Sequence, residues 1–159
     1  MGRTTIGYDT ILIAHIVTGL VGYGACFITG LMGYRAITDP LGEATVRYFS
    51  PGLGLADGAI FVVPVFGVAL VVIRWREFHT HPMWIWIGVV MWVLGVGVYL
   101  ARVWPVQVRI KKILENYQQD NDARSGSLIV SQARILARFT PWVIASYLVA
   151  VVVMVAKPT

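Results

Sequence analysis

Residues 83–101 read MWIWIGVVMWVLGVGVYLA, a run of 19 residues without a charged side chain. An α-helix crosses the hydrocarbon core of a bilayer in about 20 residues, so this run is long enough to span a membrane. A strand of an outer-membrane barrel would instead show about ten residues of alternating polarity, and nothing in this run alternates. Because backbone groups in lipid must form their hydrogen bonds internally, the run predicts a transmembrane helix.

Three further apolar runs predict three more transmembrane helices. They occupy residues 10–34, 52–73 and 139–156. The first run contains one imidazole, His15, the second contains one carboxylate, Asp57, and the third contains neither type of side chain. The sequence therefore predicts an all-α fold, that of a polytopic membrane protein with four transmembrane helices.

The composition supports this class. Hydrophobic residues make up 57% of the chain and charged residues 13%, whereas about 25% of the residues in a soluble domain are charged. These values exclude a soluble enzyme domain and a disordered regulator, and the single cysteine, Cys26, excludes an internal disulfide scaffold. We expect one integral membrane domain over residues 1–159. Because the first run is preceded by one cation, Arg3, opposed by Asp9, we expect it to be retained rather than cleaved as a signal peptide.

Residues 102–138 form the largest segment between the predicted spans, and apolar residues recur along it at helical spacing. A turn at 120–127 divides the segment, so it predicts a helical hairpin that extends the third and fourth transmembrane helices. The apolar stripe either packs within the hairpin or forms a docking surface for a partner. The stripe comprises Val106, Ile110, Ile113, Leu114 and Tyr117, followed by Leu128, Gln132, Ile135, Leu136 and Phe139.

The distribution of Lys and Arg predicts the orientation. Nine of the 13 Lys and Arg residues lie in residues 35–50 and 102–138, and cytoplasmic loops carry the excess of these residues. We therefore expect a bacterial inner-membrane protein with a cytoplasmic hairpin and with both termini outside. The net charge of +5 follows from the same bias, so we expect no nucleic-acid partner. Turn residues at 39–40 and 50–52 predict a loop between the first two spans.

Small residues line one face of the first span at alternating steps of three and four residues. Helices in lipid associate by close packing, so such a face predicts contact with another helix. That helix belongs either to the same four-helix bundle or to a different subunit. The predicted helix-contact face comprises Gly19, Gly22, Cys26, Thr29, Gly30 and Gly33.

Three histidines are candidates for binding a cofactor or a metal. His15 lies inside the first span, where ionisable residues are functional candidates, and its imidazole is a possible haem ligand. His79 and His81 lie in the loop before the third span, so a Cu or Zn site of His15, His79 and His81 is conceivable in the predicted topology. The alternative for His15 is a neutral imidazole that forms a hydrogen bond across the bundle.

Asp57 lies at the start of the second span, where the dipole of a helix stabilises a carboxylate. We predict that it caps this helix or forms an ion pair with Arg35 or Arg102, which lie at the same membrane level. The alternative is a role in a proton or cation relay.

Several segments together resemble an uncharacterised bacterial family of four-helix integral membrane proteins. That family is distantly similar to copper-resistance D-type proteins and to HemJ-type protoporphyrinogen oxidases. In the HemJ-type relatives the histidine of the first span is linked to haem, and the resemblance assigns that role to His15. The segments that carry the resemblance are Ala14-His15, Gly33-Tyr34-Arg35-Ala36, Gly54-Leu55-Ala56-Asp57-Gly58, the charged hairpin and the end Leu148-Val149-Ala150-Val151-Val152-Val153-Met154-Val155-Ala156-Lys157-Pro158.

The sequence predicts a non-catalytic accessory or scaffolding subunit of a larger bacterial inner-membrane complex, such as a lipid-transport or respiratory assembly. The expected partners are other integral membrane subunits and lipids, and no bound cofactor is expected. The alternative is a haem- or metal-binding redox or copper-resistance-like protein that uses His15. A third possibility is a small solute transporter. None of the residue patterns in the chain combines a nucleophile, a base and an orienting group, so we do not expect an enzyme.

Overall fold

The computed structural model describes residues 2–51, 55–73, 83–120 and 124–156, and all regular structure within these ranges is helical. The all-α prediction is therefore confirmed. The elements are α1 (Gly2–Thr38), α2 (Glu43–Phe49), α3 (Leu55–Ile73), α4 (Met83–Val98), a π-helical turn η2 (Tyr99–Val103), α5 (Trp104–Asp120) and α6 (Ser125–Ala156).

Four helical segments are long and apolar enough to cross a membrane, as the sequence predicts. They are Gly7–Thr38, Ala56–Ile73, Met83–Gln118 and Ser125–Ala156. Three of them are much longer than a bilayer requires, since about 20 residues suffice. The chain is therefore a four-helix, multi-pass membrane protein whose helices continue beyond the predicted spans.

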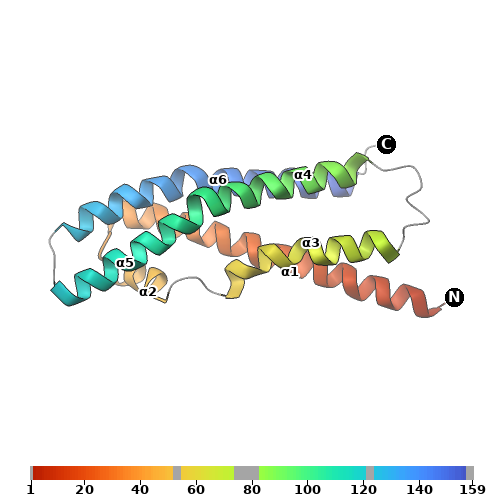
Figure 1. The fold of residues 1–159 in the computed structure, drawn as a ribbon, viewed down its shortest axis with the longest axis horizontal. Helices are drawn as coiled ribbons and strands as arrows, with labels where there is room; N and C mark the ends of the chain where they lie inside the picture. Colours follow the sequence, from red (N-terminus) through yellow and green to blue (C-terminus); the bar gives the residue numbers. More distant parts are fainter. Residues whose placement is uncertain (1, 52–54, 74–82, 121–123, 157–159) are drawn as a thin grey trace.

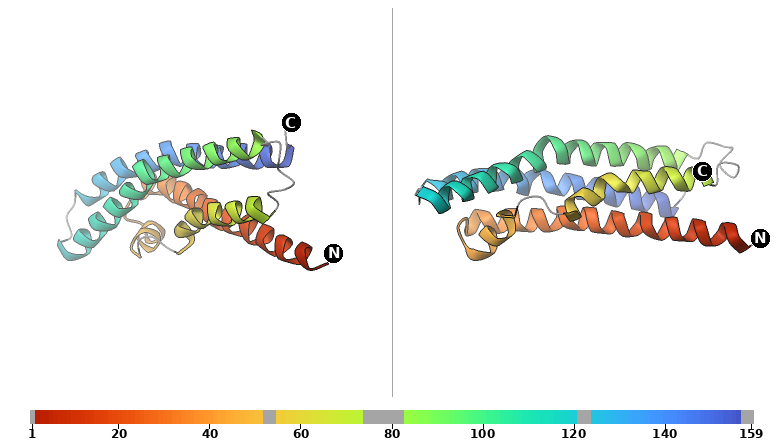
Figure 2. Two further views of the ribbon diagram at one scale, coloured as in Figure 1. Left: turned by 45° about the vertical axis from the view of Figure 1, so that its right-hand side comes forward. Right: turned by 60° about the horizontal axis from the view of Figure 1, so that its bottom comes forward.

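The helix α1 contacts two of the other three spans. It packs against α3 on one side and against α6 on another, while α4 packs against α6. The start of α1 and the end of α6 lie at one end of the molecule, and the end of α5 and the start of α6 lie at the other end (Figures 1 and 2). This arrangement agrees with four crossings, but the side of the membrane on which the termini lie stays a prediction.

The third span and the hairpin form a nearly continuous rod that changes direction at η2 (Figure 1). Pro105 follows this π-helical turn directly. A proline has no N–H to donate and its ring clashes with the carbonyl group four residues earlier, which here belongs to Ala101. The wider turn at residues 99–103 accommodates that break in the hydrogen-bond ladder, and π-helical turns and prolines are two common causes of helix bends.

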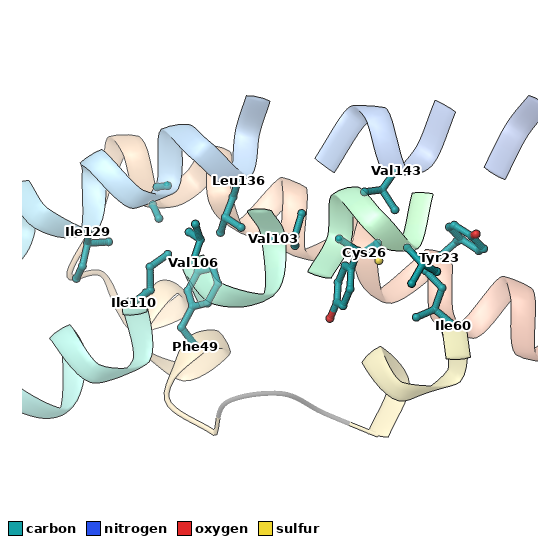
Figure 3. Packing of buried hydrophobic residues seen from close by; sticks show 14 of the residues in the cluster. Tyr23, Cys26, Phe49, Ile60, Val103, Val106, Ile110, Ile129, Leu136 and Val143 are labelled. Atoms are coloured by element: carbon teal, nitrogen blue, oxygen red, sulfur yellow. The ribbon is translucent and has the colours of Figure 1, made fainter. Parts of the chain in front are cut away.

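The apolar stripe of the hairpin is buried between α5 and α6. Figure 3 shows Ile110 and Val106 of α5 facing Ile129 and Leu136 of α6, with Phe49 of α2 against the same cluster. Burial of each such side chain contributes about 1.5–3 kcal/mol relative to full exposure. One residue of the predicted stripe differs, because Leu128 is 48% exposed on the outer side of α6.

The helix α2 differs from the loop expected between the first two spans. Its seven residues are too few to show a helical period in the sequence. The helix is held from both sides, because Phe49 is buried against the core and the Thr45 hydroxyl donates to the Asp39 carbonyl at 2.8 Å. Tertiary contacts thus stabilise a helix that is too short to be stable alone.

The helix α3 contains Pro64, which leaves the carbonyl of Ile60 without its usual donor inside the helix. The indole nitrogen of Trp92 on α4 donates to this carbonyl at 3.1 Å. A carbonyl group without a hydrogen bond is unfavourable in lipid. The bond from Trp92 satisfies the Ile60 carbonyl, and this allows the bundle to accommodate Pro64.

Candidate functional site

A buried polar cluster lies where α1, α2 and α5 meet. The Thr29 hydroxyl is 2.7 Å from the Tyr48 hydroxyl, and it accepts a hydrogen bond from the Gln107 amide nitrogen at 3.0 Å. Thr29 and Gln107 are both buried. Because buried polar groups are stable only when they are hydrogen-bonded, this network fixes α2 and α5 against the middle of α1.

Asp57 contributes a carboxylate to the same region from the first turn of α3. Its side chain is 9% exposed, and the Tyr99 hydroxyl donates to Oδ1 at 3.4 Å. Tyr99 itself is fully buried and belongs to η2. Burial, and secondarily the charges of Asp57 and Cys26, raise the pKa of Tyr48, while its hydrogen bond with Thr29 opposes the shift.

A pocket of about 470 Å³ lies beside this cluster and is bounded mainly by α1, with α2, α3 and α5 closing its polar end. Small-molecule sites typically have volumes of about 300–1,000 Å³. The lining residues are Leu20, Val21, Gly24, Ala25, Ile28, Tyr48, Phe49, Ala56, Asp57 and Gln107.

The predicted partners of Asp57 lie near the ends of their helices. Arg35 is exposed in the last turn of α1. Arg102 is also exposed, and its guanidinium carbon lies 5.3 Å from the centre of the Phe139 ring. This distance suits a cation–π contact. Tyr99 is thus a partner of Asp57 in the structure, and the pairing of Asp57 with either arginine stays a prediction.

The predicted helix-contact face of α1 is buried against helices of the same chain. A Cβ atom at Gly22 would lie 2.6 Å from the backbone nitrogen of Ile60 on α3. On the other side, Cβ atoms at Gly30 and Gly33 would lie 2.8 Å and 2.9 Å from side-chain atoms of Thr140 and Leu136 on α6. The small residues thus permit two close helix approaches within the bundle. The remaining members, Gly19, Cys26 and Thr29, are also buried.

His15 lies between α1 and α3. Its Nδ1 is 2.9 Å from the carbonyl oxygen of Val63, and its ring occupies the space over Gly67, where a Cβ atom would lie 3.2 Å from Cε1. A carbonyl group only accepts, so Nδ1 carries a proton and donates this bond. The other predicted metal ligands, His79 and His81, lie outside the described residues. Among the described residues, no group of three His, Cys, Asp or Glu side chains is placed to hold a metal ion.

Three members of the polar cluster were not predicted as site residues, namely Tyr48, Tyr99 and Gln107. A signal for Gln107 exists in the sequence, because it follows Val103 by four residues and precedes Ile110 by three, so it shares a helix face with these two apolar residues. An uncharged polar residue at a buried helical position needs a hydrogen-bond partner. No comparable signal marks the two tyrosines, since tyrosine is also typical of membrane interfaces.

In comparisons with known proteins, the chain matches no family model, no curated protein and no solved structure. The four-helix membrane architecture is therefore established by the chain's own helices, and the resemblance to copper-resistance D-type and HemJ-type proteins stays a hypothesis.

Proposed function

We propose that the protein is a non-catalytic accessory subunit of a larger bacterial inner-membrane complex, with a lipid-transport or respiratory assembly as the natural host. The observation that carries the proposal is the charged outer surface of the hairpin. Its apolar stripe is buried between α5 and α6, whereas cations remain exposed on the outside of both helices. They include Arg109 and Lys112 on α5 and Arg134 and Arg138 on α6.

The exposed cations of the hairpin suit a partner with acidic side chains. The small-residue face of α1 is covered by α3 and α6, so it supports the bundle itself rather than a second subunit. Complementary charge across an interface gives specificity and orients the partners. The apolar outer sides of the four spans suit contact with lipids or with the spans of the partner.

Purification of the tagged protein in a mild detergent, followed by mass spectrometry, tests this proposal. We expect a companion membrane protein in fixed stoichiometry. The double substitution Arg134→Glu and Arg138→Glu, on adjacent turns of one face, should release it. The matched control is Arg47→Glu, which reverses an exposed charge on α2 and should retain the companion. Recovery of a lone monomer, or equal retention by both variants, would contradict the proposal.

A second candidate is a haem- or metal-binding protein that uses His15. The hydrogen bond from Nδ1 to the Val63 carbonyl favours it, because ligating histidines commonly donate their second nitrogen to a carbonyl and bind the metal through the first. That bond orients the ring and leaves Nε2 as the nitrogen through which His15 would bind a metal. The chemistry of a bound haem or metal would be supplied by that group, while His15 would hold it.

An absorption spectrum and a metal analysis of the purified protein test this candidate. We expect a Soret band or a stoichiometric metal in the native protein and its loss in His15→Ala. The role would be excluded if His15→Ala binds as much haem or metal as the native protein. It would also be excluded if the native protein, purified without chelators, contains neither.

A further inference from the structure

We propose that the pocket beside Asp57 binds a lipophilic molecule that has one apolar chain and a hydrogen-bond-donating head of neutral or positive charge. The site is distinct from the exposed cations of the hairpin, so it stands independently of the proposed subunit role. The assignment rests on the apolar wall of the pocket, on its opening and on the polar groups at its end.

The apolar wall of the pocket lies along α1. Lining residues extend from Leu20 to Ile28, which are eight positions and therefore about 12 Å apart along a helix. Leu20 and Ile28 are 58% and 47% exposed, and both belong to the candidate span Gly7–Thr38. The pocket thus opens sideways towards the hydrocarbon region, so an apolar chain enters it from the membrane rather than from water.

Small residues, Gly24 and Ala25, lie in the middle of this wall and leave space in front of it. Gly24 lines the pocket, and a Cβ atom at this position would have no other atom within 4 Å. The glycine therefore serves no close helix contact, in contrast to Gly22 two residues earlier. The open space in front of Gly24 is where an alkyl or isoprenoid chain would pack, and it is the position at which a larger side chain fills the pocket without displacing a neighbouring helix.

The polar end of the pocket is formed by Asp57, Tyr48 and Gln107. Asp57 is the acidic residue among the lining side chains, and it is 9% exposed. A phosphate or carboxylate head would meet this acid in an environment of low dielectric, where like charges repel strongly. An ammonium or hydroxyl head instead donates a hydrogen bond to it. Because Tyr48 lies on α2, outside the candidate spans, the head would lie towards the membrane boundary and the chain deeper along α1.

Binding of three probes with the same dodecyl chain tests the head preference. The probes are dodecylamine, dodecanol and dodecanoate, and bound molecules are counted by native mass spectrometry of the full chain in a non-ionic detergent. A hydrogen bond to a charged group is worth about 1.5–3 kcal/mol, so dodecylamine should bind at least about tenfold more tightly than dodecanoate. Equal binding of the amine and the carboxylate would overturn the proposed head chemistry.

Two glycine variants test the location. Gly24→Leu fills the pocket and should abolish specific binding of all three probes. The matched control is Gly97→Leu on α4, because Gly97 is exposed, has no atom within 4 Å of a built Cβ atom and does not line the pocket. The control should bind dodecylamine as the native protein does. Equal affinity in the two variants would overturn the site, and at both positions the new Cβ atom would meet no other atom within 4 Å.

The substitution Asp57→Asn tests the role of the carboxylate. It should reduce the affinity for dodecylamine about tenfold, the equivalent of one charge-assisted hydrogen bond, and leave dodecanol binding within a few-fold of native. Unchanged amine binding would show that Asp57 does not recognise the head.

Membranes contain two sources of this chemistry, namely isoprenoid quinols and ethanolamine lipids, whose head is neutral overall and whose terminal ammonium group, rather than the phosphate, would face Asp57. Competition against dodecylamine distinguishes them, with decylubiquinol as one probe and lysophosphatidylethanolamine as the other. Displacement by either probe supports the proposal and names the source. Displacement by neither would contradict a membrane origin of the ligand.

Discussion

The close approach of α1 and α3 at Gly22 gives a quantitative prediction. A Cβ atom at this position would lie 2.6 Å from the backbone nitrogen of Ile60 and 2.9 Å from its Cα. Both atoms belong to a helix backbone, so the neighbour cannot yield by rotating a side chain. Inserting a methyl group into a well-packed contact costs about 1–3 kcal/mol. A Gly→Ala change inside a helix also contributes a gain of about 0.5–1 kcal/mol, so we expect Gly22→Ala to be neutral to moderately destabilising.

The substitution Gly24→Ala is the matched control, since Gly24 lies in the same helix and has open space where the methyl group would be. The gain in helix propensity is common to both variants and cancels in their difference. We therefore expect Gly22→Ala to be less stable than Gly24→Ala by about 1–3 kcal/mol.

Equilibrium unfolding in mixed micelles of a mild detergent and dodecyl sulphate measures this difference. Gly22→Leu extends the series, because three further carbon atoms must force α1 and α3 apart, and it should be less stable than Gly22→Ala. If Gly22→Ala and Gly24→Ala unfold at the same denaturant fraction, the close contact between α1 and α3 does not carry the packing that the distances imply.

Three other predictions follow from single hydrogen bonds. Trp92→Phe removes the donor to the Ile60 carbonyl and should destabilise the bundle by about 1–3 kcal/mol in the same assay; an unchanged stability would show that the carbonyl is satisfied elsewhere. Thr29→Val deletes the hydroxyl at the centre of the polar cluster and should lower the free energy of unfolding by a similar amount. The Thr18 hydroxyl bonds within its own helix, so Thr18→Val should leave the stability nearly unchanged. The raised pKa of Tyr48 contributes stability that is complete below the ordinary value of 10.0 and is lost as pH rises through the folded-state value. Stability should therefore fall as pH rises from 10.0 towards the raised folded-state pKa of Tyr48, and the fall should be smaller in Tyr48→Phe; equal slopes would refute the assignment.

The four spans were predictable because a helix that crosses the bilayer needs about 20 consecutive apolar residues, and such runs can be read directly from the sequence. The residues at which the helices begin and end could not be predicted in the same way. The first span was predicted for residues 10–34, yet α1 covers Gly2–Thr38, because a helix continues into water where polar residues still support it. The helix α2 escaped prediction for a different reason, since its stability comes from burial of Phe49 rather than from its own seven residues.

In the candidate site, too, some residues could be predicted from the sequence and others could not. Asp57 and Thr29 stood out in the sequence, one as a charge in an apolar run and the other as a polar member of a small-residue face. Their partners, Tyr99 and Tyr48, come from elements 42 and 19 residues away in sequence. No local pattern encodes such pairings, because they depend on how the helices are rotated against one another.

The sequence by itself determined that this chain is an all-α membrane protein with four crossings, since the cost of unpaired backbone groups in lipid leaves helices as the solution for apolar runs of this length. The tertiary structure decided which helices meet. It assigned the small-residue face of α1 to α3 and α6, and it brought Asp57 to a laterally open pocket. Small residues permit a close contact with any helix, so the choice among partners requires the complementary surfaces that exist in the assembled bundle.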